Sequence, residues 1–234
     1  MRLASLFTFF CVVTLPFAVR AQTQYFTVSG GYNALFRHNL PHELAYTNYS
    51  TADLQAAFTG ISAEDFALEF GANYRTVDDF RHAFPENAVL QPTIVSTTFS
   101  RLSIFATAGK AWGDEAIGIR FILSGGFGAT FLLPAKAEAL NPQYGAKAFP
   151  KDPAQQNAYY FYRGIDADAV GRLSVQIPVG ESGWLLVPYA QARLGLTNIF
   201  LRDEYGNEKL LDCAIGIGLR ANLTYHQSPF SRMY

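Results

Sequence analysis

The segment AIGIGLRANLTY, residues 214–225, alternates between two kinds of side chain at every step. Its odd-numbered residues, among them Ile215, Ile217 and Leu219, are apolar, whereas its even-numbered residues, among them Gly218 and Arg220, are small or polar. Successive side chains of a β-strand point to opposite faces of the sheet. The segment therefore predicts a strand with one apolar and one polar face. Such strands occur in soluble sheets and in membrane barrels, so the pattern alone does not identify the solvent.

The same alternation recurs through the rest of the chain. It predicts seven further strands, at residues 25–34, 51–60, 65–76, 97–110, 116–133, 168–178 and 184–199. The pattern is least clear at residues 51–60. These strands are longer than the roughly five or six residues usual in soluble sheets, and they are long enough to cross a bilayer.

The connections between the predicted strands are of two lengths. Short connections lie at residues 61–64, 111–115 and 179–183, and long ones at residues 35–50, 77–96, 134–167 and 200–208. Short and long connections alternate, which places all the long loops at one end, as in outer-membrane barrels. A Greek-key sandwich has no reason to separate its loops in this way. The sequence therefore predicts an all-β fold: an eight-stranded antiparallel up-and-down transmembrane β-barrel with short periplasmic turns and long external loops.

The first residues have the composition of an export signal. Arg2 precedes a mostly apolar stretch that ends at a small-residue cleavage site, Val19-Arg20-Ala21. Thr8, Thr14 and Pro16 interrupt the apolar stretch, which argues against a membrane anchor. We therefore predict a signal peptide at residues 1–21 and an outer-membrane barrel domain at residues 22–234. Cys213 would then be the only cysteine left, so no intramolecular disulfide is expected.

Charge and composition exclude other classes of protein. Cleavage removes two of the 18 Lys and Arg, and the 16 that remain against 19 Asp and Glu give a formal charge of −3. No basic stripe is present, so nucleic acid is not an expected partner. The 20 Phe and 13 Tyr suit a β-rich chain. Beyond the leader, no stretch is apolar for long enough to predict a transmembrane helix.

Alternate residues of a strand share one face, and we call each such set a parity. On each of six predicted strands, the polar parity includes one arginine. These are Arg75, Arg101, Arg120, Arg172, Arg193 and Arg220. Glu69 and Asp53 share this parity, and Asp168 lies near the rim of its strand. Inward-facing arginines would have to pair with carboxylates or polar groups, because an unpaired buried charge is costly. The favoured hypothesis is a polar plug that makes the barrel rigid, and the second is a weakly cationic conduit for small anions.

Candidate catalytic and metal sites are weak in this sequence. His38 and His42 with Glu43 form a small cluster, but without a helix to set their spacing they do not predict a metal or a catalytic base. His82 and His226 lie outside the predicted strands. We expect no catalytic residues, no cofactor and no metal.

Aromatic residues at predicted strand ends and in the longest loop suggest contacts with the surroundings. The candidates for interfacial girdles are Trp184, Tyr189, Tyr225, Tyr32 and Trp112. The loop at residues 134–167 carries the aromatic run 159–162, which predicts either a recognition surface for an extracellular ligand or an extension of the flanking strands. A chain in this location is also expected to contact outer-membrane lipid and the barrel-assembly machinery.

Three segments resemble a known family. They are LQAAFTGISAEDFALEFGANYR at residues 54–75, GLTNI at residues 195–199 and IGIGLR at residues 215–220. Together they resemble the porin-like outer-membrane β-barrel family of Gram-negative bacteria. The resemblance implies an eight-stranded barrel in the outer membrane and, for most members, no assigned activity. This chain departs from the common pattern by continuing from His226 to Tyr234 after the last predicted strand.

These observations leave three functional hypotheses. The first is a non-enzymatic outer-membrane barrel for envelope integrity or loop-mediated surface interaction, with limited passage of small solutes. The alternative is a soluble exported β-barrel that binds an apolar ligand inside, with the apolar parity facing inward. The third is a lipid-modifying barrel enzyme that would depend on His38 or His42.

Overall fold

The computed structural model describes residues 23–38, 49–84, 93–114, 118–139, 163–180, 183–199 and 209–224. Every regular element in these residues is a β-strand, and none is a helix long and apolar enough to cross a membrane. The strands are β1 (Thr23–His38), β2 (Tyr49–Ile61), β3 (Phe66–Phe84), β4 (Thr93–Asp114), β5 (Ile119–Ala139), β6 (Ile165–Val179), β7 (Trp184–Gly195) and β8 (Lys209–Asn222).

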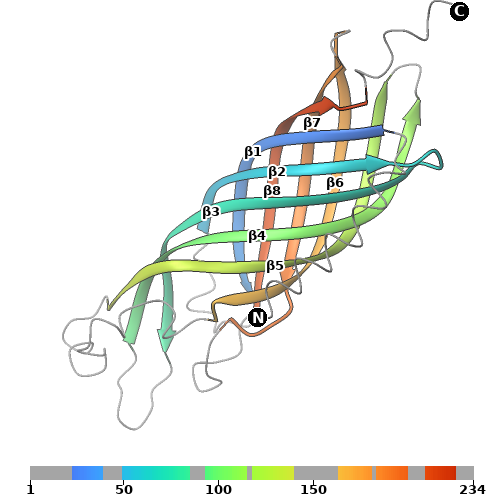
Figure 1. Cartoon of the computed structure of the whole chain (residues 1–234). Coiled ribbons are helices and arrows are strands. Elements are labelled where there is room, and N and C mark those ends of the chain that lie inside the picture. The colour runs from blue at the N-terminus through green and yellow to red at the C-terminus, as the bar shows by residue number, and fades with distance from the viewer. Residues whose placement is uncertain are drawn as a thin grey trace, which may run out of the picture.

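Each strand pairs antiparallel with its neighbours in sequence, and β1 pairs with β8 to close the barrel (Figure 1). Four residues separate the strands at one end, at residues 62–65, 115–118 and 180–183. We call this the turn end and the opposite end the loop end. The predicted all-β, eight-stranded antiparallel up-and-down barrel and the separation of short from long connections are confirmed.

Residues with a left-handed backbone conformation close the short connections. Asp65 has φ of 61°, and Gly118, Gly180 and Gly183 have φ of 75°, 61° and 75°. Glycine occupies this region without steric cost and aspartate tolerates it better than most residues. The Ser62 hydroxyl accepts hydrogen bonds from the Glu64 and Phe66 amides at 3.3 and 3.2 Å, which holds the first turn in shape. These local devices make the turns tight.

The stagger of the barrel follows from the strand register. A line perpendicular to the strands leaves β1 at Tyr25 and returns to β1 at Leu35. It passes through Thr59, Glu69, Thr107, Gly126, Val170, Arg193 and Asp212. The stagger is therefore ten residues around eight strands, as expected for strands tilted by about 35–45° to the barrel axis. Because of this tilt, the line climbs from the turn end toward the loop end as it goes round.

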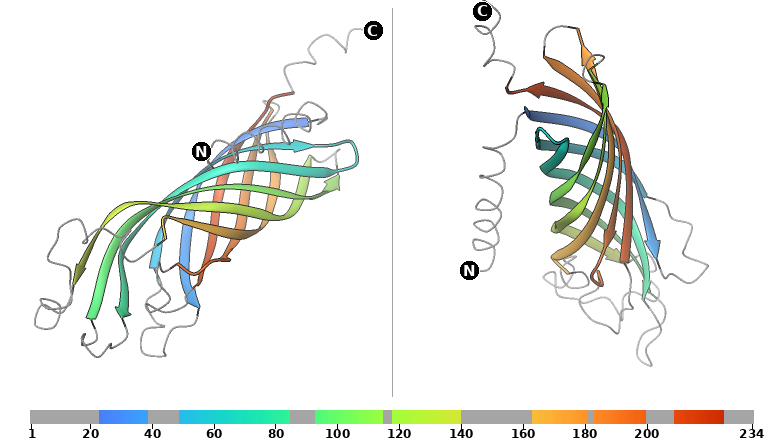
Figure 2. Two further views of the ribbon diagram at one scale, coloured as in Figure 1. Left: turned by 60° about the horizontal axis from the view of Figure 1, so that its bottom comes forward. Right: turned by 90° about the vertical axis from the view of Figure 1, so that its right-hand side faces the viewer.

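Three strands extend far beyond the predicted boundaries. β3 continues to Phe84, β4 begins at Thr93, and β5 continues to Ala139, so most of predicted loop 77–96 and the start of loop 134–167 are strand. The loop ends of these three strands run past those of their neighbours (Figures 1 and 2). Side-chain alternation lapses there, but backbone pairing continues through irregularities at Val77/Phe80 and Thr98/Ser100. The prediction erred because it followed the side chains, whereas the ladder depends on the backbone.

The last two strands differ from their predicted bounds for identifiable reasons. β7 ends at Gly195 because the Asp166 carboxylate accepts the Thr197 amide hydrogen bond at 3.2 Å, which competes with the ladder. β8 ends at Asn222, whose side chain accepts a hydrogen bond from the Thr224 amide at 3.0 Å. β8 also begins at Lys209, five residues before the predicted start, and this difference places Asp212 in the barrel wall.

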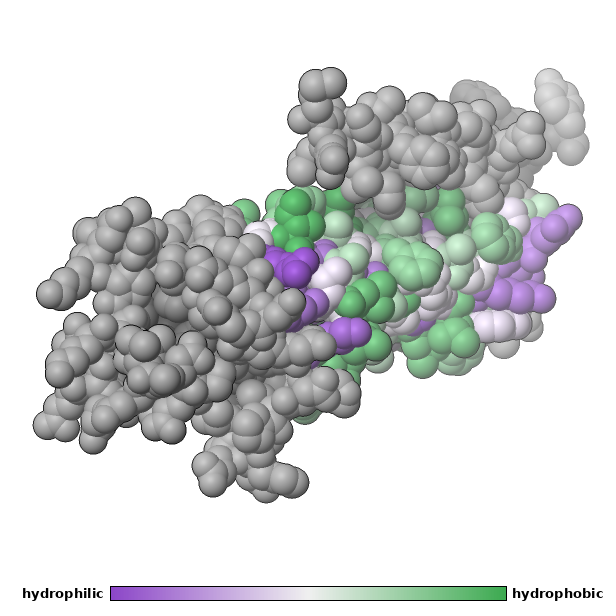
Figure 3. Space-filling model, turned by 90° about the horizontal axis from the view of Figure 1, so that it is seen from below, coloured by the Kyte–Doolittle hydropathy of each residue, from purple (hydrophilic) through white to green (hydrophobic). Residues whose placement is uncertain are grey.

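Side chains alternate between the lumen and the outside along every strand. β8 is representative: Asp212, Ala214 and Arg220 are buried, while Ile215 and Ile217 are 66% and 53% exposed. Figure 3 shows hydrophobic side chains gathered over the middle of the visible face, with hydrophilic residues toward both ends. The apolar parity therefore faces outward and the polar parity faces the lumen. Cys213 lies on the outward parity, half-buried.

Candidate functional site

The predicted arginines lie in the lumen. Five of them are 3% exposed or less: Arg75, Arg101, Arg172, Arg193 and Arg220. Arg120 shares the inward parity but lies near the turn end, where its Nη2 is 4.0 Å from Asp65 and its side chain is 14% exposed. Glu69 and Asp53 are buried beside the five arginines, and so is Asp168. These residues form two networks along the barrel axis, which meet at Tyr189: its hydroxyl donates to Asp53 and its ring lies under Arg172.

Asp212 is the centre of the network nearer the loop end. Its carboxylate lies 2.8 Å from Nη1 of Arg75 and accepts hydrogen bonds from Nη1 of Arg101 at 3.0 and 3.2 Å. Arg75 and Arg101 face each other across the β3–β4 ladder. Asp212 reaches them from β8, so a single carboxylate ties together strands on opposite walls of the barrel.

Asp53 extends this loop-side network to two more strands. It lies 3.6 Å from Nε of Arg75 and accepts a 2.7 Å hydrogen bond from the Asn73 amide. The Tyr189 hydroxyl donates to its second oxygen at 3.1 Å. Tyr189 is 5% exposed, so its predicted place in an outer girdle is wrong. Tyr32, Trp112 and Trp184 do face outward, and Tyr225 lies outside the described residues.

The remaining buried charges on the loop side are Asp166, Asp168 and Arg193, and Asp166 accepts a hydrogen bond from the Thr197 amide at 3.2 Å. The Thr130 hydroxyl donates a short hydrogen bond to Asp168. The Arg193 guanidinium lies over the Phe105 ring, 4.8 Å from its centroid, a distance at which a cation is attracted to an aromatic face. Arg193 also lies opposite Asp212 across the β7–β8 ladder. In total, the loop side of the lumen holds three buried arginines and four buried aspartates.

Glu69 is the centre of the second network, nearer the turn end. Its two oxygens lie 3.3 Å from Nε of Arg172 and 3.2 Å from Nη2 of Arg220. The Thr59 hydroxyl donates to it at 2.9 Å, and Nε of Arg220 donates to the Thr27 hydroxyl at 2.6 Å. Glu69, Arg172 and Arg220 come from β3, β6 and β8, no two of which are neighbours. This turn-side network therefore crosses the lumen.

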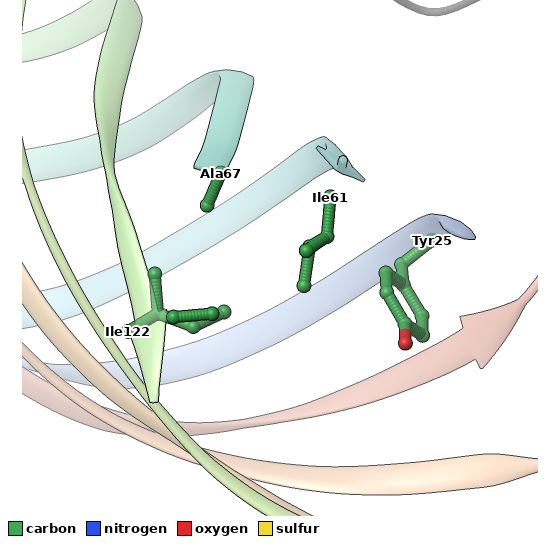
Figure 4. Packing of buried hydrophobic residues seen from close by; sticks show 5 residues of the cluster. Tyr25, Ile61, Ala67 and Ile122 are labelled. Atoms are coloured by element: carbon green, nitrogen blue, oxygen red, sulfur yellow. The ribbon is translucent and has the colours of Figure 1, made fainter. Parts of the chain in front are cut away.

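Apolar layers separate and close the two networks. Tyr25, Ile61, Ala67, Ala111 and Ile122 form a buried cluster that fills the turn end of the lumen (Figure 4). A second cluster, Ala57, Phe105 and Val170, lies between the turn-side and loop-side networks. Large apolar side chains thus alternate with charged layers along the axis.

The two networks can stabilise the barrel and hold its strands in register, because their charged side chains contact one another rather than an open cavity. Asp212 and Glu69 bind guanidinium groups from strands that are not their neighbours, which opposes slippage of the register. Among the described residues, no group of three or more His, Cys, Asp or Glu is placed to hold a metal ion. His38 ends β1 and His82 lies within β3, not in loops as predicted, and His42 and His226 lie outside the described residues.

Three luminal residues were missed by the sequence reading. Asp212 was missed because the predicted strand began at residue 214, although Asp212 continues the same parity as Gly216 and Arg220. Tyr189 shares the parity of Gln191 and Arg193, which was the available signal. Asp166 was missed because the predicted strand began two residues after it.

Comparison with known proteins gave similarities among solved structures only. No protein-family model and no curated protein matches the chain, so the porin-like resemblance stays a prediction. The chain is similar to outer membrane protein OprG of Pseudomonas aeruginosa, with 11% identity, a TM-score of 0.48, and coverage of 86% of this chain and 97% of that chain. It is similar to Neisserial surface protein A, with 11% identity, a TM-score of 0.47, and coverage of 84% and 96%. It is also similar to Ail, the attachment invasion locus protein of Yersinia pestis, with 11% identity, a TM-score of 0.41, and coverage of 84% and 97%.

Proposed function

We propose that this chain is a non-enzymatic outer-membrane β-barrel that contributes to envelope integrity and presents its loop end to the outside of the cell. The single observation that carries the proposal is that large apolar side chains cover the outside of the closed barrel. Its exposed side chains include Phe127 at 69%, Ile215 at 66% and Leu54 at 62%. Soluble monomeric proteins rarely expose apolar surface of this extent to water.

The distribution of charge on the outside supports the same location. Among outward-facing strand positions whose side chains are described, the only charged residues are Lys110, near the turn end, and Lys209, at the loop end. Trp112 and Trp184 are exposed at the turn end, where aromatic rings would meet the lipid headgroups. Outer-membrane barrels expose an apolar band about 25 Å tall between such girdles.

The alternative of a soluble barrel with an apolar ligand inside is contradicted by the burial pattern. That hypothesis requires the apolar parity to face inward and the arginines to face water. In the structure Arg75, Arg193 and Arg220 are at most 1% exposed, while Ile215 and Leu54 are among the most exposed side chains. The assignment of the two parities is therefore the reverse of what a soluble ligand-binding barrel needs.

The lumen favours the plug hypothesis over the conduit. Phe105 and Ile61 are 1% and 0% exposed, and they belong to apolar layers that lie on either side of the turn-side network. Eight strands enclose little more space than their own side chains fill. We therefore expect single barrels reconstituted in planar bilayers to show no stable ion conductance. A steady open channel would support the conduit hypothesis instead.

The outer-membrane proposal is tested by behaviour in detergent and by labelling. The mature protein should need detergent to stay monomeric, and its electrophoretic mobility should change when it is heated. A mature protein that remains monomeric in buffer without detergent would contradict the proposal.

A matched pair of cysteines tests the orientation of the wall. In a Cys213→Ala background reconstituted in vesicles, Leu219→Cys should react with a lipid-soluble maleimide, because residue 219 is 48% exposed on the outward parity. Thr107→Cys is the control, since residue 107 is 1% exposed and faces the lumen. Rapid reaction of the cysteine at 219 with a water-soluble maleimide would contradict the proposal that this face of the wall contacts lipid.

The partners belong to the same proposal. Outer-membrane lipid would contact the outward parity, and the barrel-assembly machinery would insert the chain. The long loop of residues 140–164 between β5 and β6 is the candidate contact for an extracellular ligand, although residues 140–162 lie outside those described. Depletion of the assembly machinery should remove the protein from the outer-membrane fraction, and unchanged insertion would argue against that partner.

A further inference from the structure

The two luminal networks differ in their balance of charge. On the loop side, Arg75, Arg101 and Arg193 face four buried aspartates, Asp53, Asp166, Asp168 and Asp212. On the turn side, Arg172 and Arg220 share one carboxylate, that of Glu69. Among described residues that point into the turn-side half of the lumen, Glu69 is the only acid. Arg120 does not alter this balance, because it lies beside Asp65 at the turn. The turn-side network therefore carries one positive charge in excess.

The excess charge is held on guanidinium nitrogens that have no hydrogen-bond partner among the described residues. Arg172 and Arg220 are 3% and 0% exposed. Arg172 uses Nη1 on Gln191 and Arg220 uses Nε on Thr27, but Nη2 of Arg172 and Nη1 of Arg220 are buried without a partner. Nε2 of Gln176, a third buried donor on the same inward parity, is also without one.

Aromatic faces compensate part of this charge, because Arg172 lies 4.5 Å from the centroid of the Tyr189 ring and Arg220 lies 5.6 Å from that of Tyr25. The Tyr25–Ile61–Ile122 cluster lies on its turn-end side, and the Phe105 layer and Tyr189 lie between it and the loop-side aspartates. A buried charge without a counter-charge is costly enough that proteins pair it or neutralise it. Three buried donors without an acceptor, next to one surplus positive charge, favour an acceptor that is small and negatively charged.

We propose that the turn-side half of the lumen binds one small monovalent anion of the halide class, held between the guanidinium groups of Arg172 and Arg220. Its single negative charge would balance the network, and its size would suit a lumen that side chains otherwise fill. Gln176 would contribute a third donor. The proposal does not depend on the cellular location of the barrel, so it can fail while the proposed function stands.

Bromide provides a direct test of this site. Crystals of the detergent-solubilised protein soaked in sodium bromide should give an anomalous peak within hydrogen-bonding reach of both Arg172 and Arg220. A lumen filled by water would give no such peak. Absence of the peak, or bromide bound only at the loop end or outer surface, would overturn the proposal.

Stability measurements give an independent test in solution. Chloride replaced by gluconate at constant ionic strength should weaken the barrel against urea, since a ligand bound only by the folded state stabilises it by mass action. At a chloride concentration ten times the dissociation constant, the unfolding equilibrium constant should be about 11-fold lower than in gluconate.

Charge variants predict opposite changes in this halide effect. Arg172→Gln removes the surplus charge and should abolish the dependence on chloride, whereas Glu69→Gln leaves two uncompensated guanidiniums and should enlarge it. Arg193→Gln is the matched control, because it removes a buried arginine from the loop side, where aspartates outnumber arginines, and should leave the chloride dependence unchanged. The same chloride dependence in all three variants would contradict the proposal. If Arg172→Gln does not fold, the Glu69→Gln variant and the bromide peak still decide it.

Discussion

At the scale of single residues, the lumen depends on a few carboxylates that each serve several donors. Asp212 accepts from two arginines, and Asp53 accepts from an amide and a phenol while it lies beside Arg75. Charge-assisted hydrogen bonds in a dry interior are strong, and the loss of one partner leaves a desolvated charge behind. The energetic weight of these residues therefore comes from the groups that would be stranded without them.

Asp212→Asn should destabilise the barrel by about 3–5 kcal/mol, because it leaves the Arg75 and Arg101 guanidiniums without their shared counter-charge. Urea unfolding in detergent micelles or vesicles measures this change. Asp65→Asn is the control. Asp65 is half-exposed and its contact with Arg120 is weak, at 4.0 Å. Asparagine also tolerates the left-handed backbone at this position. Equal losses in the two variants would show that Asp212 is not a special acceptor.

Tyr189→Phe should cost about 0.5–1.5 kcal/mol, because it removes the hydroxyl donor to Asp53 and keeps the ring beneath Arg172. The same unfolding assay applies. Tyr32→Phe, at an outward position 56% exposed, should change stability little. A neutral Tyr189→Phe would indicate that Asp53 is fully satisfied by Asn73 and Arg75.

At the scale of elements, glycines set how closely neighbouring strands can approach each other. A Cβ at Gly126 in β5 would lie 2.0 Å from the Ala106 carbonyl oxygen of β4, a contact with backbone that no side-chain rotation relieves. On β6, a Cβ at Gly171 would meet nothing within 4 Å. The two glycines lie on adjacent strands but on opposite parities, so one is required by packing and the other is not.

Gly126→Ala should therefore destabilise the barrel by more than about 1 kcal/mol, within the usual range for overpacking. Gly171→Ala should be neutral or slightly stabilising, because alanine loses less backbone entropy on folding. Unfolding midpoints of the two variants under the same conditions give the comparison. A more damaging substitution at Gly171 than at Gly126 would contradict this account of the strand contacts.

At the scale of the whole molecule, closure of the barrel and the proposed bilayer would act together. The β1–β8 ladder removes the two free sheet edges, and lipid would cover the apolar outer band. The cost of a charge on the outside should then depend on its depth in the membrane, which no single strand determines. This dependence distinguishes a barrel surrounded by lipid from one that is soluble.

Ile215→Arg should reduce stability in vesicles by about 2–4 kcal/mol, because Ile215 is 66% exposed near the middle of the apolar band. Leu223→Arg, just beyond the turn end of β8, should cost about 0–1 kcal/mol. Reversible refolding into lipid vesicles measures both. Equal costs at the two positions would argue against a bilayer centred on the barrel wall.

Much of the fold could be predicted because alternation is a local property of the chain. The outward position of Ile215 and Ile217 and the inward position of Arg220 follow from parity within one segment, and they are confirmed. Strand ends were predicted less well, as at Phe84 and Gly195, because backbone pairing and the competing hydrogen bond of Asp166 override the side-chain pattern there.

The alternation along the chain is enough to predict eight amphipathic strands, with turns and loops at opposite ends and arginines on the polar face. The contacts of Asp212 with Arg75 and Arg101, and of Glu69 with Arg172 and Arg220, become visible only in the closed barrel. Those contacts join strands that are not neighbours, and they depend on the ten-residue stagger that sets the height of each side chain in the lumen. Stagger is a property of the closed ring of ladders, so no single strand contains it.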